Sequence, residues 1–184
     1  KLSPESPCPV VKNKNSRLVL GGAGNVANCL RGLGLDFCLI FCEEDKLPVN
    51  YKLFDKFQYY SYSRPGFYQS IKIRHVVDNV QFFREDKELN SDHFEYSEII
   101  VSKIIDILII KKINFLVISD YQKGALTNNE LMEILEFCFK KNIKTFIDTK
   151  ISDIKFLNNA FLLKPNFKEF CTLTGEIPKI FNKE

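Results

Sequence analysis

Residues 21–27, Gly-Gly-Ala-Gly-Asn-Val-Ala, follow the short apolar run of residues 18–20 and decide the fold. Glycines let a backbone turn sharply and approach a bound ligand with no Cβ atom in the way. A helix that begins directly after them leaves its first N–H groups free for a polar ligand. The stretch predicts a strand, a tight turn and a helix, with Gly21, Gly22 and Asn25 as candidate binding residues. A glycine-rich turn without a ligand is the alternative, since short glycine motifs match often by chance.

The rest of the chain alternates between apolar runs typical of buried strands and amphipathic segments typical of helices. Strands are predicted at 17–20, 37–42, 115–119, 144–148 and 160–164, and helices at 22–33, 91–112, 127–141 and 166–173, with a short helix near 50–57. Residues 70–86 predict a pair of antiparallel strands lying off the main sheet. The pattern predicts an α/β fold with a mostly parallel central sheet and helices on both faces.

Composition narrows the class of protein. A chain of 184 residues with 45% hydrophobic content is enough for one globular domain, and a net charge of +3 without an arginine-rich block does not favour nucleic acid as a partner. The six cysteines form no CxxC pair, and the two histidines have no ligand-like spacing to them, which predicts reduced thiols in a cytoplasmic protein. Charged and polar residues interrupt the longest apolar stretch, residues 99–110, and no signal peptide is visible, so no membrane segment is expected.

Three of the predicted buried strands end in polar clusters, at 119–124, 148–150 and 164–169. Ligands in parallel α/β folds bind beyond the carboxyl ends of the strands. Each cluster alone has a structural explanation, because Asp, Asn and Gly are ordinary turn and cap residues, but three at one edge favour a site. The candidate residues in these clusters are Asp120, Tyr121, Lys123, Asp148, Lys150, Lys164, Asn166 and Glu169.

Residues 21–27, followed by Leu33-Gly34, resemble the first signature of the ribokinase-like (PfkB) carbohydrate kinases. Residues 2–11, LSPESPCPVV, resemble the ISPEAPVPVV segment of the D-glycero-β-D-manno-heptose-7-phosphate kinases in that family. The clusters SDYQKG, IDTK and KPNFKEF are similar to the SDYAKG, IDPKG and TPNxxEF motifs of the same kinases. The predicted strand pair is similar to their TKxRV…QxxRxDxE stretch.

The resemblance implies transfer of the γ-phosphoryl group of ATP to the anomeric hydroxyl of a sugar 7-phosphate, a step towards ADP-heptose and the lipopolysaccharide core. It implies that the glycine loop with Asn25 holds the sugar and that the strand pair is a lid whose Lys72, Arg74 and Arg84 reach a phosphate. Arginine and lysine suit that role, although a solvated strand face is the alternative. It further implies that Asn166 and Glu169 organise Mg²⁺ and phosphate, Glu169 as the metal ligand and Lys164 as a phosphate contact. The sugar-phosphate pocket would include Asp120, Tyr121 and Lys123, with Asp148 and Lys150 serving similarly, and lids would pair in a homodimer.

The resemblance covers nearly all of residues 1–184, but these residues cover only part of the family's domain. They lack the family's first strand and the GAGD segment with its Asp base in the C-terminal nucleotide-binding part, so the 184 residues alone are expected to be inactive. Residues 43–45, Glu-Glu-Asp, replace the family's Gly-x-Asp turn. The alternatives are another ribokinase-like sugar kinase, a non-catalytic sugar-phosphate-binding or dimerisation module, and a Rossmann nucleotide-binding domain, which the missing third glycine disfavours.

Overall fold

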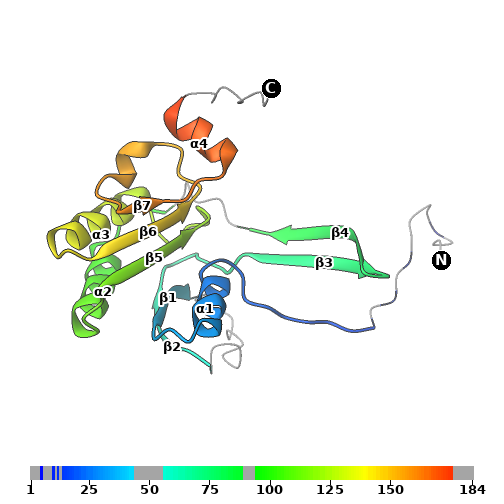
Figure 1. Ribbon diagram of the computed structural model, residues 1–184. Helices are drawn as coiled ribbons and strands as arrows, with labels where there is room; N and C mark the ends of the chain where they lie inside the picture. Colours follow the sequence, from blue (N-terminus) through cyan, green and yellow to red (C-terminus); the bar gives the residue numbers. More distant parts are fainter. Residues whose placement is uncertain are drawn as a thin grey trace, which may run out of the picture.

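The computed structural model describes residues 5, 10, 12, 14–43, 56–88 and 94–175, and Figure 1 shows how the elements are arranged. The helices are α1 (Gly22–Gly32), α2 (Glu98–Ile110), α3 (Asn128–Lys140), α4 (Phe167–Thr174) and the 3₁₀ helix η3 (Ile154–Leu157). The strands are β1 (Cys38–Glu43), β2 (Gln58–Ser63), β3 (Ile71–Val77), β4 (Val80–Lys87), β5 (Phe115–Asp120), β6 (Lys144–Thr149) and β7 (Leu162–Leu163). The predicted α/β class is confirmed.

The parallel strands pair in two groups within the described part of the chain. β1 and β2 form a two-stranded parallel sheet, and β5, β6 and β7 form a three-stranded parallel sheet. β3 and β4 form an antiparallel hairpin that projects away from the other elements (Figure 1). The expected strand pair off the main sheet is therefore present.

The hydrophobic core lies between these sheets and helices α2 and α3. Cys42 of β1 and Tyr62 of β2 pack with Ile104 of α2 and Ile134 of α3 in one cluster. Leu39 on the other face of β1 packs with Ala27 of α1, so that helices cover both faces of this sheet. Burial of this kind supplies most of the stabilisation of such a fold.

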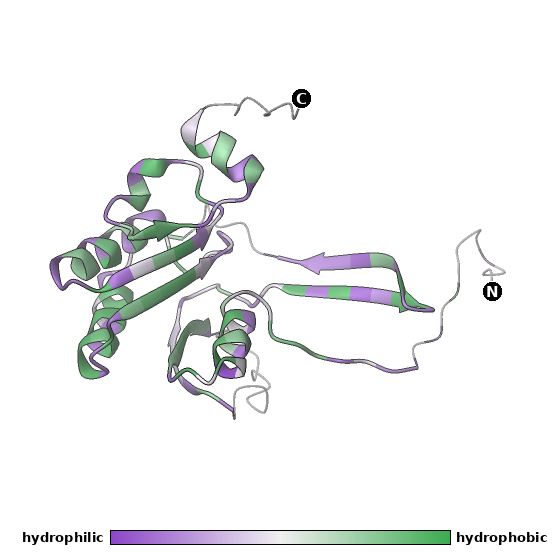
Figure 2. Cartoon of the chain, viewed as in Figure 1, coloured by the Kyte–Doolittle hydropathy of each residue, from purple (hydrophilic) through white to green (hydrophobic). Residues whose placement is uncertain are grey.

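A second cluster joins α3 to the three-stranded sheet. Leu131 and Leu135 of α3 are fully buried against Ile118 of β5 and Ile147 of β6. The alternate residues of β5 point to the other face, where Phe115 is 63% and Val117 45% exposed. Strand β5 is hydrophobic along most of its length in Figure 2, whereas β6 is hydrophobic only in its middle.

Helix starts follow the capping signals that the sequence carries. Thr127 and Glu130 form a capping box at the start of α3, and Asn166 and Glu169 form one at the start of α4. Each box satisfies two backbone donors that a helix start leaves unpaired. Gly34, at φ +70, continues the chain after α1 as expected of a glycine beyond a helix end.

Three predicted elements differ from the structure. Residues 17–20 form no strand and approach α1 as irregular backbone, and the last strand is limited to the two residues of β7. The helix expected from residue 91 begins at Glu98, because tertiary contacts hold the preceding residues: the Ser97 N–H donates to Glu130 and the Glu95 carbonyl accepts from Arg64.

Strand β2 was not predicted. Its sequence, QYYSYS, has an irregular apolar pattern, and it becomes a strand by pairing with β1 over six residues of each chain segment. Most of the helix predicted near residues 50–57 lies outside the described residues.

None of the described helices has the length and apolar character that crossing a membrane requires.

Candidate functional site

The ends of β5 and β6 place two of the predicted polar clusters side by side. Asp120 pairs with Thr149 in the strand register, and the Lys150 N–H donates to the Asp120 carbonyl at 3.2 Å. The carboxyl ends of both strands therefore lie at the same edge of the sheet, as the parallel arrangement requires. The residues that follow, 121–126 and 150–151, form the surroundings of the candidate site.

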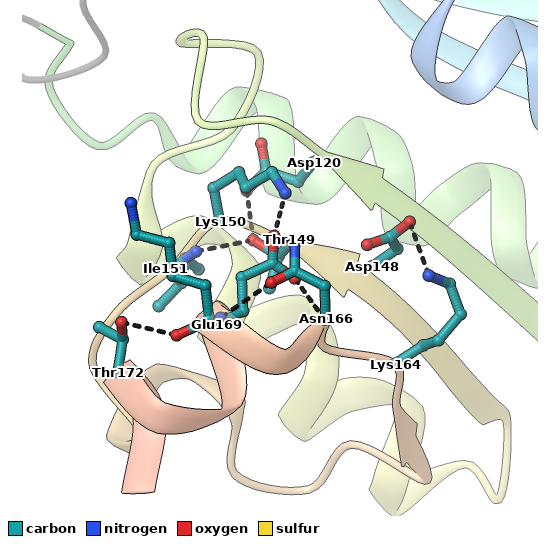
Figure 3. Close-up of polar contacts among 10 residues, drawn as sticks. Asp120, Asp148, Thr149, Lys150, Ile151, Lys164, Asn166, Glu169 and Thr172 are labelled. Atoms are coloured by element: carbon teal, nitrogen blue, oxygen red, sulfur yellow. Dashed lines mark hydrogen bonds and ion pairs between the residues drawn. The ribbon is translucent and has the colours of Figure 1, made fainter. Parts of the chain in front are cut away.

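Asp120 is 7% exposed and its carboxylate accepts bonds from within the protein. The Gln122 N–H donates at 2.9 Å, the Gln122 side-chain amide at 2.5 Å and the Thr149 hydroxyl at 3.1 Å. A buried carboxylate needs such partners, since an unpaired one would be costly. In this structure Asp120 holds the loop after β5 against the end of β6 (Figure 3), and its predicted role in sugar binding stays a prediction.

Tyr121 connects this loop to the glycine stretch. Two atoms of its ring lie 3.8 Å from the place where a Cβ atom on Gly22 would stand, and Gly22 has a φ of +49. A glycine therefore suits this position both for its backbone conformation and for the close approach of the ring. Gly21 is the N-cap of α1, and Asn25 is exposed in the first turn of that helix. The glycine loop and the loop after β5 thus share one edge.

Lys150 extends the group towards α4. Its ammonium lies 5.7 Å from the centre of the Tyr121 ring and forms an ion pair with Glu169. Hydrogen bonding to Glu169 raises the pKa of Lys150, and the same bond from Lys150 lowers the pKa of Glu169. Both groups are therefore charged at neutral pH.

A pocket of about 320 Å³ lies beside this ion pair. Figure 3 shows Glu169 directed towards Lys150 and Asn166. The Asn166 N–H donates to Glu169 at 2.8 Å and the Asn166 side-chain amide at 2.6 Å, so the carboxylate already has three partners. The pocket is lined by Lys150, Ile151, Ser152, Asn166, Lys168, Glu169 and Thr172.

The Glu169 carboxylate is the kind of ligand that magnesium accepts, but in this structure its oxygens are engaged by Lys150 and Asn166. Magnesium is commonly held by one or two carboxylates together with substrate phosphates and water, rather than by a cage of protein ligands. Among the described residues no group of three Asp, Glu, His or Cys side chains could hold a metal on its own. Glu169 could contact an ion only if Lys150 moved to another partner, for which a phosphate is the natural choice.

Asp148 and Lys164 form a separate pair at 3.5 Å. Asp148 points to the opposite face of β6 from Thr149, because successive side chains of a strand alternate. Figure 3 shows this pair apart from the Asn166–Glu169 cluster. Lys164 and Lys150 therefore pair with different carboxylates, Asp148 and Glu169.

The hairpin brings the predicted lid cations to the loop after β5. Lys72 of β3 pairs with Asp86 at 3.1 Å and also with Glu88, and Arg84 pairs with Asp86 at 2.7 Å. Lys123 pairs with Glu88 at 2.6 Å, which ties the base of the hairpin to the loop. Neither Asp86 nor Glu88 was among the predicted site residues, although both lie in the stretch whose basic residues were chosen.

Arg74 and Arg84 stand directly opposite each other in the hairpin register. Like charges at such positions lie about 5 Å apart at Cβ and repel each other. Arg84 has Asp86 as a partner, whereas Arg74 makes no ion pair within the described segments. Two facing guanidinium groups of which only one pairs with a carboxylate suit an added anion.

Contacts with Phe94 also hold the loop after β5 in place. A Cβ atom on Gly124, whose φ is +86, would lie 2.2 Å from the Phe94 ring. The Arg64 guanidinium lies 5.4 Å from the same ring and pairs with the fully buried Glu130 at 2.5 Å. These contacts were missed by sequence reasoning, because no local pattern links residues so far apart in the chain.

The structure so far defines a mixed α/β protein with parallel sheets and a projecting hairpin, whose charged side chains gather where the strands end. No protein-family model matches the chain. The chain is 33% identical over 185 aligned residues to the bifunctional protein HldE of Aliivibrio fischeri, covering 96% of this chain and 37% of that protein. It is 30% identical to HldE of Nitratiruptor sp., covering 97% of this chain and 38% of the relative, and 31% identical to HldE of Vibrio cholerae, covering 96% and 37%.

The chain is therefore related along almost its whole length to proteins named HldE, but it spans less than two fifths of their length. The activity of the complete relatives is assigned to this chain only as a proposal.

Proposed function

We propose that this chain forms the sugar-phosphate-binding part of an ATP-dependent heptose kinase, which phosphorylates D-glycero-β-D-manno-heptose 7-phosphate at its anomeric hydroxyl. The observation that carries the proposal is that Lys72 from the hairpin and Lys123 from the loop after β5 meet at one carboxylate, Glu88. Lys150, after the end of β6, lies 5.7 Å from the centre of the Tyr121 ring in the same loop. A phosphate dianion is the ligand chemistry that such a group suits. The relatedness to HldE proteins over nearly the whole chain supports the heptose-phosphate class.

The roles follow from the positions of the side chains. The glycine turn with Asn25 lies beside Tyr121 and would contact the sugar hydroxyls. The hairpin would close over the sugar with Lys72, Arg74 and Arg84 directed to its phosphate. Asp120 keeps the loop with Tyr121 and Lys123 in place through Gln122 and Thr149.

ATP and Mg²⁺ would be the other reactants, on the side of Asn166, Glu169 and Lys164. Magnesium bound there would neutralise charge on the phosphoryl group during transfer. The residues of this chain would bind and orient: Glu169 would contact the ion, and Lys150, released from Glu169, would contact a phosphate oxygen. The general base and the anion hole would be supplied by sequence outside these 184 residues.

The hairpin also suits the proposed homodimer of lids in a cytoplasmic enzyme. The residues of β3 alternate between hydrophobic and hydrophilic in Figure 2. The register places Ile73, Val77, Val80 and Phe83 on one face of the hairpin, and each is more than two fifths exposed. Exposed apolar side chains clustered in this way mark an interaction surface. Sedimentation of the chain should show dimers, and Val80→Asp should shift them to monomers.

The direct test is binding of the sugar phosphate. The 184-residue chain is titrated with heptose 7-phosphate and with the unphosphorylated heptose at two ionic strengths. We expect the phosphate ester to bind at least about tenfold more tightly at low salt, and the difference to shrink at high salt as screening grows. Lys72→Met should reduce the difference, whereas Lys103→Met on the exposed side of α2 should not. Equal affinities for the two sugars would contradict the proposal.

Catalysis separates a kinase from a non-catalytic binding module. The 184 residues alone should show no ATP-dependent phosphorylation, whereas a protein extended by a segment with the Gly-Ala-Gly-Asp motif should show it. General-base loss by itself lowers rates about 10² to 10⁴-fold. Glu169→Gln in the extended protein should lower kcat, and Glu136→Gln on the exposed face of α3 should leave it unchanged.

A further inference from the structure

Glu88 occupies an unusual place between the hairpin and the loop after β5. It follows β4 directly and its side chain is 22% exposed. One carboxylate oxygen pairs with Lys72 of β3, and the other lies 2.6 Å from the Lys123 ammonium. A single carboxylate thus links two cations that come from different parts of the fold.

The base of the hairpin holds Glu88 in this position. The Tyr68 hydroxyl donates to the Glu88 carbonyl at 3.0 Å, and the Lys87 ammonium lies 5.2 Å from the centre of the Tyr68 ring. Hydrogen bonds from Lys123 and Lys72 lower the pKa of Glu88, so that it stays ionised at neutral pH. The carboxylate is therefore anchored through its own backbone.

The cations that Glu88 engages are those proposed to bind the substrate phosphate. Lys72, Arg74, Arg84 and Lys123 carry four positive charges, and Asp86 and Glu88 carry two negative ones. In the free protein Glu88 holds both Lys72 and Lys123, so a dianion reaches these two cations only by displacing the carboxylate. A dianion that stayed next to Glu88 would be repelled, because close like charges repel each other.

We propose that Glu88 is a built-in competitor for the phosphate group: it bridges Lys72 and Lys123 in the free protein, and an incoming phosphate monoester takes both cations from it. The exchange needs no covalent step, since each cation trades one anionic oxygen for another. It releases the tie between the loop and the hairpin at the moment of binding. Glu88 thus determines specificity, because a neutral sugar gives the cations nothing in exchange.

This inference rests on the proposed phosphate site, and its test keeps the two apart. Orthophosphate is titrated calorimetrically into the 184-residue chain, into Glu88→Gln and into Glu85→Gln at low salt. Gln keeps the size of the side chain and removes its charge. Glu85 lies on the same strand but on the opposite face of the hairpin, opposite Ile73 in the register, so its variant controls for net charge alone.

We expect Glu88→Gln to bind orthophosphate about tenfold more tightly than the wild type, and Glu85→Gln to bind it as the wild type does. Adding Lys123→Met to Glu88→Gln should remove the gain, because the released cation is then missing. Unchanged or weaker binding by Glu88→Gln would overturn the inference, as would an equal gain in Glu85→Gln or no binding by any of the proteins.

The same proteins report on the proposed function separately. If orthophosphate binding rises in Glu88→Gln but heptose 7-phosphate binds no better than orthophosphate, the competitor role stands and the heptose assignment fails. If heptose 7-phosphate binds selectively but Glu88→Gln brings no gain, the assignment stands and the competitor role fails.

Discussion

The loop after β5 and the β3–β4 hairpin both carry candidate phosphate-binding cations, yet the two regions are held in different ways. The loop rests on buried groups: Asp120 is satisfied by three internal donors, and the Phe94 ring supports Gly124. The hairpin is exposed along both strands, and its attachment to the loop relies on the ion pair of Glu88 with Lys123. Buried contacts are insensitive to salt, whereas exposed ion pairs are weak and screened.

This difference suits a site that must be both formed in advance and able to open. A rigid loop at the strand ends keeps the sugar-binding groups in position, so that binding costs little ordering. A hairpin held by exposed ion pairs can exchange a carboxylate partner for a bound anion at a small cost in free energy. The comparison yields four predictions, given from the largest expected effect to the smallest.

Removing the charge of Glu130 should damage the rigid region most. Its buried carboxylate pairs with Arg64 and accepts the N–H groups of Ser97 and Thr127. We expect Glu130→Gln to lower the free energy of unfolding by about 3 kcal/mol, since the buried guanidinium loses its counter-charge. Urea unfolding measures the loss, with the exposed Glu136→Gln as the control. A loss below about 1 kcal/mol would mean that the pair contributes little to the core.

A methyl group on Gly124 should strain the loop after β5 where it packs against Phe94. Gly124→Ala combines a positive φ with a Cβ atom 2.2 Å from the Phe94 ring, so the ring must move. We expect a loss of about 2 kcal/mol in thermal or urea unfolding. Gly32→Ala is the control, because nothing lies within 4 Å of its Cβ position and the helical backbone accepts alanine. Equal stabilities of the two variants would contradict the account of the loop.

Removing the charge of Lys72 should weaken the attachment of the hairpin to the loop after β5 much more than it lowers the free energy of unfolding of the whole protein. Lys72→Met removes the ion pairs with Asp86 and Glu88 at a position that is 38% exposed. The free energy of unfolding should change by less than about 1 kcal/mol. Amide hydrogen exchange in β3 and β4 should nevertheless become faster, while that of β5 and β6 stays the same. An equal change in both regions would show that the hairpin is coupled to the core.

Acidification should break the ion pair between Glu88 and Lys123 that ties the hairpin to the loop after β5. The pKa of Glu88 is lowered from 4.5 by hydrogen bonds from Lys123 and Lys72, so its contribution is fully present above pH 4.5. The contribution is lost as the pH falls through the lower pKa of the folded state. Hydrogen exchange or amide chemical shifts of β4 should report this step, and Glu88→Gln should abolish it. A step of the same size in the variant would assign it to another group.

Much of the candidate site follows from local signals in the sequence. The polar clusters after the apolar runs of β5 and β6 predicted the shared edge at which Asp120 and Lys150 lie, and the short helix predicted from residue 166 is present as α4. The hairpin was predicted from its alternation. The sequence did not show which partners these side chains have. Asp120 accepts a hydrogen bond from Thr149, Glu169 pairs with Lys150, and Lys123 pairs with Glu88.

The sequence by itself determined the α/β class, the starts of α1, α3 and α4, and the chemistry available at the strand ends, because period, capping and turn residues act over a few neighbouring positions. The tertiary structure decided that QYYSYS pairs with β1 as strand β2, and that α2 begins at Glu98 rather than earlier. It also decided which carboxylate each cation meets. Such choices depend on segments far apart in the chain, and only packing of the whole fold brings Glu88 between Lys72 and Lys123.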